Sequence, residues 1–122
     1  MPTVTLVLAG GPGFPAGSAD HRYEIEVRLD AGGRLDPAAW AADPAPWPAR
    51  RFRPGAPVRG GDVQFDAETG WSLRFDPEAG RDTELTEPLV HADVLRPGEH
   101  VTLRAENGQD WPYRVVGVEG AQ

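Results

Sequence analysis

Residues 99–118 have the sequence EHVTLRAENGQDWPYRVVGV, and this stretch decides the expected fold. Apolar and polar side chains alternate with a period of two on both sides of Asn107-Gly108, and β-branched and aromatic residues supply the apolar set. An Asn-Gly pair between two alternating segments is a strong signal for a tight turn. The stretch therefore predicts a β-hairpin.

The register of this hairpin follows from which residues would share its inner face. A three-residue loop at 106–108 sets Leu103 opposite Trp111, whereas a two-residue turn would mix polar and apolar residues on that face. A slip of one residue would move every side chain to the other side of the sheet. We therefore expect the three-residue loop, with Gly108 in the left-handed conformation that closes a type I turn with a bulge.

A second hairpin signal lies earlier in the chain. Residues 63–70, VQFDAETG, share the form V-x-(apolar)-x-A-E-x-G with residues 101–108, VTLRAENG. A loop at 68–70 would set Phe65 opposite Leu73, again with the glycine at positive φ. Short turn signals of this kind recur by chance, so common hairpin chemistry explains the match better than an internal repeat.

The remaining elements are predicted from the alternation of apolar and polar residues and from the positions of proline and charged residues. Period-two patterns predict strands at residues 3–8 and 23–29, with a loop at 10–20 between them. Residues 50–53 suit an edge strand guarded by charged side chains. Residues 85–94 form a further strand whose Pro88 suits an edge position or a bulge.

One short helix is expected near residues 36–43. Asp36 can cap it, Pro37 suits the first helical position, and Pro44 ends it. Together these elements predict an all-β fold in a single domain of residues 1–122. We expect a small antiparallel β-sandwich or a partly open barrel of about seven or eight short strands.

Composition excludes several function classes. The formal charge of −7 argues against binding to nucleic acid or to an anionic membrane surface. The chain has no cysteine, which excludes disulfides and thiolate metal sites. All twelve Lys and Arg residues are arginine, which is typical of a GC-rich bacterial genome. The N-terminus lacks a basic segment before its apolar run, so we expect a cytoplasmic protein.

No catalytic or metal-binding constellation stands out, and no cofactor is expected. His91 and Asp93 would share a face of a strand and could supply two metal ligands, but a solvated strand pair explains them more simply. Glu24 and Glu26 also share a strand face, and the alternation places that face in water, where carboxylates keep ordinary acidity. We therefore expect neither pair to be catalytic.

Residues 40–53, WAADPAPWPARRFR, form the most interesting candidate surface. Arg50, Arg51 and Arg53 concentrate positive charge in an acidic chain, and on a strand Arg51 and Arg53 would share one face while Arg50 occupies the other. Arginine forks beside aromatic walls suit a small anionic ligand. We predict a ligand site made of these arginines with Trp40 and Trp47. The alternative is that Trp40, Trp47 and Phe52 plug one end of the core and the arginines pair with surface acids.

Three function classes stay open on sequence grounds. A non-enzymatic binding or interaction module, self-associating as a homodimer or recognising a protein partner, is preferred because no catalytic pattern is evident. A β-barrel that binds a small anionic ligand is the alternative, and a pocket with convergent polar groups would favour it. A small hydrolase or isomerase would need a histidine bonded to a carboxylate inside a cleft.

Overall fold

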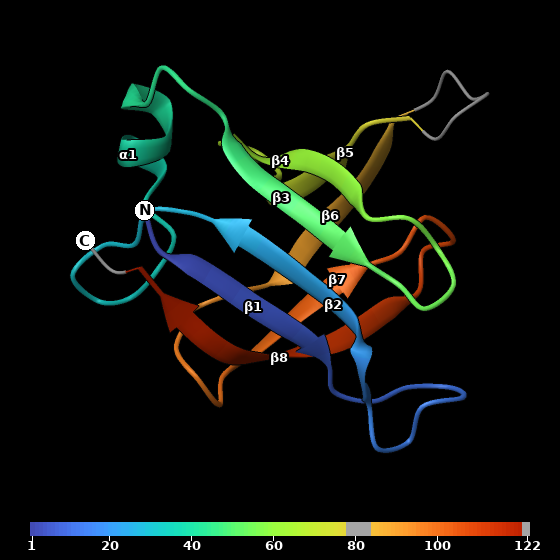
Figure 1. The fold of residues 1–122 in the computed structure, drawn as a ribbon. Helices are drawn as coiled ribbons and strands as arrows, with labels where there is room; N and C mark the ends of the chain where they lie inside the picture. The colour runs from blue at the N-terminus through green and yellow to red at the C-terminus, as the bar shows by residue number, and fades with distance from the viewer. Residues whose placement is uncertain (78–83, 121–122) are drawn as a thin grey trace.

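The computed structural model describes residues 1–77 and 84–120. These residues form eight strands and one helix: β1 (Thr3–Leu8), β2 (Ser18–Glu26), α1 (Pro37–Ala42), β3 (Trp47–Phe52), β4 (Arg59–Asp66), β5 (Gly70–Phe75), β6 (Leu85–His91), β7 (His100–Arg104) and β8 (Asp110–Glu119). Each strand pairs antiparallel with the next one along the chain, and β8 pairs with β1. The result is a closed up-and-down barrel (Figure 1).

The all-β prediction with one short helix is confirmed, and of the two expected architectures the chain forms the barrel. The barrel is closed rather than partly open, because β1 and β8 pair from Thr3 opposite Glu119 to Leu8 opposite Tyr113. No helix in the described residues is long and apolar enough to cross a membrane.

The hairpin of β7 and β8 has the predicted register. Leu103 lies opposite Trp111 and Val101 lies opposite Tyr113. The loop is closed by two backbone hydrogen bonds between Ala105 and its partners across the turn, at 2.8 and 2.9 Å. Gly108 has a φ of 84°, so the glycine occupies the left-handed position that the bulged turn requires.

The hairpin of β4 and β5 differs from the prediction by two residues. Phe65 lies opposite Trp71 instead of Leu73, and the loop is formed by residues 67–69. The turn begins earlier because the Asp66 carboxylate accepts hydrogen bonds from two loop amides at 2.8 and 3.2 Å. A shift of two residues keeps every side chain on its expected face, and Gly70 still has a positive φ of 86°.

The strand expected at a sheet edge, β3, and the strand that contains Pro88, β6, are both interior strands. β3 pairs with both β2 and β4, and β6 pairs with both β5 and β7, because the barrel closes. Pro88 is accommodated near a register shift between Leu89 and His91, which is the bulge that the sequence offered as the alternative. The strand β2 begins at Ser18, inside the segment expected to be a loop.

The helix α1 lies at one end of the barrel and packs Trp40 against the core. Asp36 caps it by accepting a hydrogen bond from the Ala39 amide at 3.1 Å. Trp40 on the helix donates its indole N–H to the carbonyl of Val63 at 2.9 Å, which fixes the helix against β4. At the same end, Trp47 is fully buried and stacks on Trp71 with ring centroids 5.8 Å apart.

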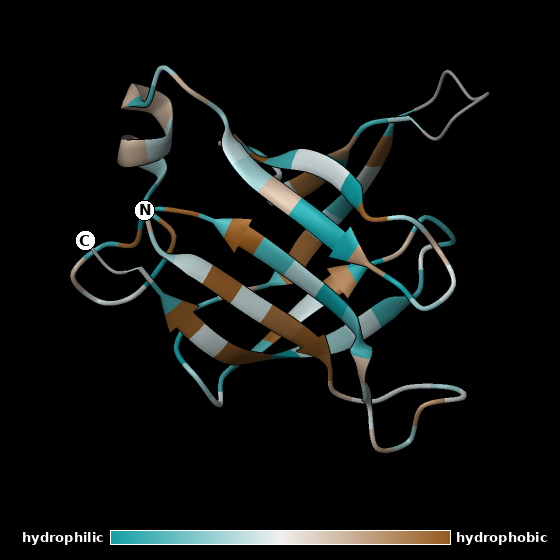
Figure 2. Ribbon diagram, in the orientation of Figure 1, coloured by the Kyte–Doolittle hydropathy of each residue, from teal (hydrophilic) through white to brown (hydrophobic). Residues whose placement is uncertain are grey.

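The barrel interior is apolar along most of its length. Apolar and polar residues alternate along the strands in Figure 2, and the inward set is almost completely buried. Its central members, contributed by six strands, are Val4, Leu6, Ile25, Val63, Leu73, Val101 and Val115. The end of the barrel opposite α1 is different, because polar side chains there point inward.

Candidate binding cavity at one end of the barrel

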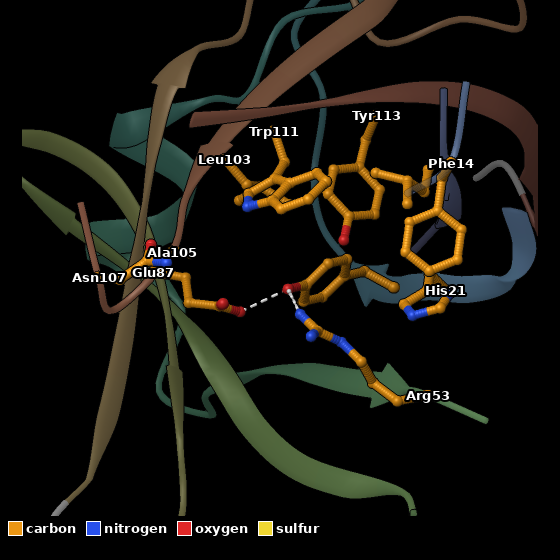
Figure 3. Close-up of a pocket in the computed structure, with 11 residues that line it drawn as sticks. Phe14, His21, Arg53, Glu87, Leu103, Ala105, Asn107, Trp111 and Tyr113 are labelled. Atoms are coloured by element: carbon orange, nitrogen blue, oxygen red, sulfur yellow. Dashed lines mark hydrogen bonds between the residues drawn. The ribbon is translucent and has the colours of Figure 1, made fainter. Parts of the chain in front are cut away.

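A cavity of about 230 Å³ occupies the barrel end opposite α1. Figure 3 shows the side chains that line it. They come from β1, β2, β6, β7, β8, the end of β3 and the loops at this end: Leu8, Phe14, His21, Tyr23, Arg53, Glu87, Leu103, Ala105, Asn107, Trp111 and Tyr113. Drug-sized ligands occupy cavities of about 300–1,000 Å³, so this one suits a smaller molecule.

Aromatic rings form most of the cavity wall. Tyr23 and Tyr113 meet edge to face with centroids 5.0 Å apart, and Phe14 meets His21 edge to face at 4.6 Å. Trp111 lies on the same wall (Figure 3). Rings in these orientations offer flat apolar surface, which a planar ligand can contact.

The loop between β1 and β2 is folded to bring its aromatic residue to this wall. Backbone hydrogen bonds from Phe14 to Gly11 at 2.9 Å and from Gly17 to Phe14 at 3.0 Å form two consecutive turns. Gly11 has a φ of 136°, and a Cβ there would overlap the ring of Trp111. The loop therefore needs glycine where it passes over the indole.

The floor of the cavity carries a buried carboxylate, Glu87, which is 3 % exposed. The Tyr23 hydroxyl donates a hydrogen bond of 2.5 Å to its Oε1, and Arg51 Nη1 lies 3.8 Å from its Oε2. Arg53 Nη2 donates to the Tyr23 hydroxyl oxygen at 3.4 Å. A charge this deeply buried has to be paired or hydrogen-bonded, and Tyr23 and Arg51 fill that role for Glu87.

Two arginines and one buried carboxylate meet at the floor of the cavity. Arg51 and Arg53 both point inward from the end of β3, and Glu87 is the carboxylate that faces them. The Nε of Arg53 is buried, and within residues 1–77 and 84–120 it has no hydrogen-bond partner. A buried guanidinium N–H without an acceptor costs free energy.

Burial changes the acidity of three side chains of the cavity. Burial, together with the charge of Glu87, raises the pKa of Tyr23 well above its ordinary value. Burial likewise raises the pKa of Tyr113. The pKa of His21 is lowered, first by burial and then by the positive charge of Arg53. At neutral pH the two phenols therefore keep their protons and His21 is uncharged.

The three predicted arginines lie on the faces that the sequence assigned to them. Arg51 and Arg53 face the interior, whereas Arg50 faces outward and pairs with Glu24 at 3.4 Å and Glu26 at 3.3 Å. The two acids therefore lie on the wet face, as expected. Arg50 is held by these surface carboxylates and does not line the cavity.

The two predicted tryptophans do not join the arginines. Trp40 and Trp47 lie at the α1 end, because β3 runs the length of the barrel and carries Trp47 at one end and Arg51 at the other. The indole N–H of Trp47 donates a hydrogen bond of 3.0 Å to the Asp43 carboxylate, which fixes the ring at that end. The structure does not bring these tryptophans together with the arginines; they pack at the α1 end, as the alternative had it. Phe52, the third residue of that alternative, instead lies at the other end of β3, where the Arg22 guanidinium is 4.1 Å from its ring centroid.

The pair of His91 and Asp93 is not brought together with further ligands. Asp93 pairs with Arg34 at 2.5 Å, outside the strand, and His91 is exposed at the end of β6. Across the described residues, no group of three His, Cys, Asp or Glu side chains could hold a metal ion.

Several cavity residues escaped sequence reasoning, and one carried a usable signal. In the segment LTEPL, the alternation Leu85, Glu87, Leu89 places a carboxylate in phase with two buried leucines. A charged residue at a position that the alternation places on the buried face indicates either that the buried face was assigned wrongly or that the residue has a function. Trp111 and His21 come together only because the barrel closes, and no local sequence pattern predicts that closure.

In a comparison with known proteins, no protein-family model, no curated protein and no solved structure matches this chain.

Proposed function

We propose that the protein is a small binding barrel whose cavity takes a small carboxylate that carries one aromatic ring. The observation that carries the proposal is the guanidinium of Arg53, which lines an aromatic cavity and, among the described residues, makes one side-chain hydrogen bond, the long one of 3.4 Å to Tyr23. A carboxylate matches a guanidinium fork, and a single ring matches the wall of Phe14, Trp111 and Tyr113.

Charge and size support the same ligand class. Two inward arginines face one buried carboxylate, so an incoming anion would balance the remaining positive charge. The volume of about 230 Å³ favours one ring over a larger fused system. Eight-stranded barrels are just wide enough to hold one small ligand when their side chains leave room.

The geometry supports binding better than hydrolysis. A histidine that acts as a general base is usually oriented by a carboxylate. The Nδ1 of His21 instead lies 3.0 Å from the hydroxyl of Ser18, three residues away on the same strand. We therefore place a binding role before a catalytic one.

The test measures binding of 3-phenylpropionate by isothermal titration calorimetry, with 3-phenylpropionamide as the neutral analogue. We expect the acid to bind and the amide to bind far more weakly. Arg53→Met should reduce the affinity for the acid by about ten- to a hundredfold, the usual effect of losing hydrogen bonds to a charged group. The matched control is Arg50→Met, on the outer face of the same strand. Equal affinity in both variants, or equal binding of acid and amide, would overturn the proposal.

A further inference from the structure

A second hollow, of about 600 Å³, adjoins the cavity on the side of β3 and β4. It is lined by Arg51, Arg53, residues 55–60, Asp76 and Pro77. Arg53 lines both hollows, and Arg51 lines the second while contacting Glu87 in the first. The arginine pair therefore stands where the two spaces meet. We call the second hollow the β3–β4 groove.

The β3–β4 groove combines apolar residues with its arginine edge, with Asp76 and with Arg59, whose Nε donates to the Asp76 carbonyl at 3.0 Å. Ala56, Pro57, Val58 and Pro77 contribute carbon surface, and Val58 is 54 % exposed. A Cβ added at Gly60 would meet no atom within 4 Å, so the wall is open there. The groove thus offers apolar surface next to a cationic edge, which suits the hydrocarbon arm of an anionic molecule.

Glu87 adds a third requirement for the ligand. One of its oxygens accepts the hydrogen bond from Tyr23, while Oε2 lies 3.8 Å from Arg51, beyond hydrogen-bond range. An N–H on the ligand, placed beside its carboxylate, would meet an acceptor at this oxygen. A carboxylate bound to Arg53 would then have a donor group next to it, a ring on one side and an apolar arm on the other.

We infer that the ligand is an N-acylated aromatic amino acid, with its ring in the cavity, its carboxylate on Arg53, its amide N–H toward Glu87 and its acyl chain in the β3–β4 groove. This inference rests on the proposed function, because it extends the same site from a ring acid to a branched one. In such a molecule one carbon atom carries the carboxylate, the aromatic side chain and the amide nitrogen. These three substituents would reach the arginine pair, the cavity and the β3–β4 groove, respectively.

The test follows affinity against acyl length. N-acetyl-, N-butyryl- and N-hexanoylphenylalanine are titrated beside 3-phenylpropionate into the wild type, Val58→Asn and the control Val116→Asn. Val116 is also exposed, at 44 %, but lies on β8 and does not line the groove. Full burial of a methylene gives about fourfold in affinity, so we expect at least about twofold per methylene in the wild type and the control. The gain should be largely lost in Val58→Asn.

The outcomes separate the two proposals. If 3-phenylpropionate binds but affinity does not rise with chain length, or rises equally in Val58→Asn, the acyl arm does not lie in the groove and only this inference falls. If neither 3-phenylpropionate nor any acylated compound binds, the proposed function fails and the inference fails with it.

Discussion

Removing a single hydroxyl should show how strongly the barrel depends on its buried polar floor. In Tyr23→Phe the ring stays and the hydroxyl that donates to Glu87 at 2.5 Å is lost. The carboxylate, which is 3 % exposed, then loses its hydrogen bond from the phenol. Arg53 loses the acceptor that it contacts at 3.4 Å, a longer and weaker interaction.

The expected cost follows from these contacts. A hydrogen bond to a charged group contributes about 1.5–3 kcal/mol, and the long Arg53 contact adds little, so we expect a loss of about 2–3 kcal/mol. For 122 residues at about 2.1 cal/mol/K each, the entropy of unfolding is roughly 0.26 kcal/mol/K. The melting temperature should therefore fall by about 8–12 °C.

Differential scanning calorimetry at pH 7 measures this shift directly. Tyr113→Phe is the matched control, because it removes the other buried tyrosine hydroxyl and leaves the bond from Tyr23 to Glu87 in place. The control should lose less than about 1 kcal/mol, or about 4 °C. A melting temperature for Tyr23→Phe within about 2 °C of the wild type would refute the reasoning.

Alkaline unfolding gives a second measure of the same group. The pKa of Tyr23 is raised by burial and by Glu87, so above pH 10 the unfolded chain loses a proton that the folded protein retains. Stability is therefore fully present below pH 10 and falls as pH rises, by up to about 1.4 kcal/mol per pH unit from Tyr23. Urea titrations at pH 9, 10 and 11 should show a shallower decline in Tyr23→Phe than in the wild type.

Four further outcomes are expected. Gly61→Ala should cost at least about 2 kcal/mol in urea unfolding, because its Cβ would overlap the backbone of β5, whereas the neighbouring Gly60→Ala has open space and should be tolerated. Gly108→Val and Gly70→Val should each cost about 1–2 kcal/mol from positive φ alone, and unchanged urea midpoints would contradict the turn geometry. Because the pKa of His21 is depressed in the folded protein, its contribution to stability is present above pH 6.5 and is lost as pH falls below that value. The wild type should therefore lose stability relative to His21→Gln between pH 7.5 and 5.5. A difference in unfolding free energy that does not change with pH would contradict this. Light scattering at micromolar concentration should give twice the monomer mass of 13.2 kDa if the expected homodimer forms, and the monomer mass would end that expectation.

Local patterns in the sequence predicted much of the fold. The alternation around Gly108 gave both the β7–β8 hairpin and its register, because a wrong register would have exposed an entire apolar face. The β4–β5 hairpin was displaced by two residues, since both registers bury the same side chains and the choice fell to the hydrogen bonds of Asp66. Closure of the barrel was not predictable from any single segment, and this is why β3 was expected at an edge and an edge position stayed open for β6.

The candidate site was predicted only in part for a related reason. Period two along β3 placed Arg51 and Arg53 on one face correctly, because that argument is local. Nearness in sequence then suggested Trp47 as a neighbour, although a strand of six residues carries its two ends about 17 Å apart. The groups that do surround Arg53, such as Tyr23 and Glu87, are contributed by strands whose positions depend on the order of the whole barrel.

The pairing of β1 with β8 has a consequence for how the barrel assembles. Seven of the eight strand pairs join neighbours along the chain, but this one joins residues near its two ends, from Thr3 opposite Glu119 onward. Such a contact carries the largest loop-closure entropy and is expected to form after the local hairpins. Until it forms, both strands have an unpaired edge, and a second copy at high concentration could supply the missing neighbour. Strand exchange between two chains during refolding is therefore the misassembly to which this topology is most exposed.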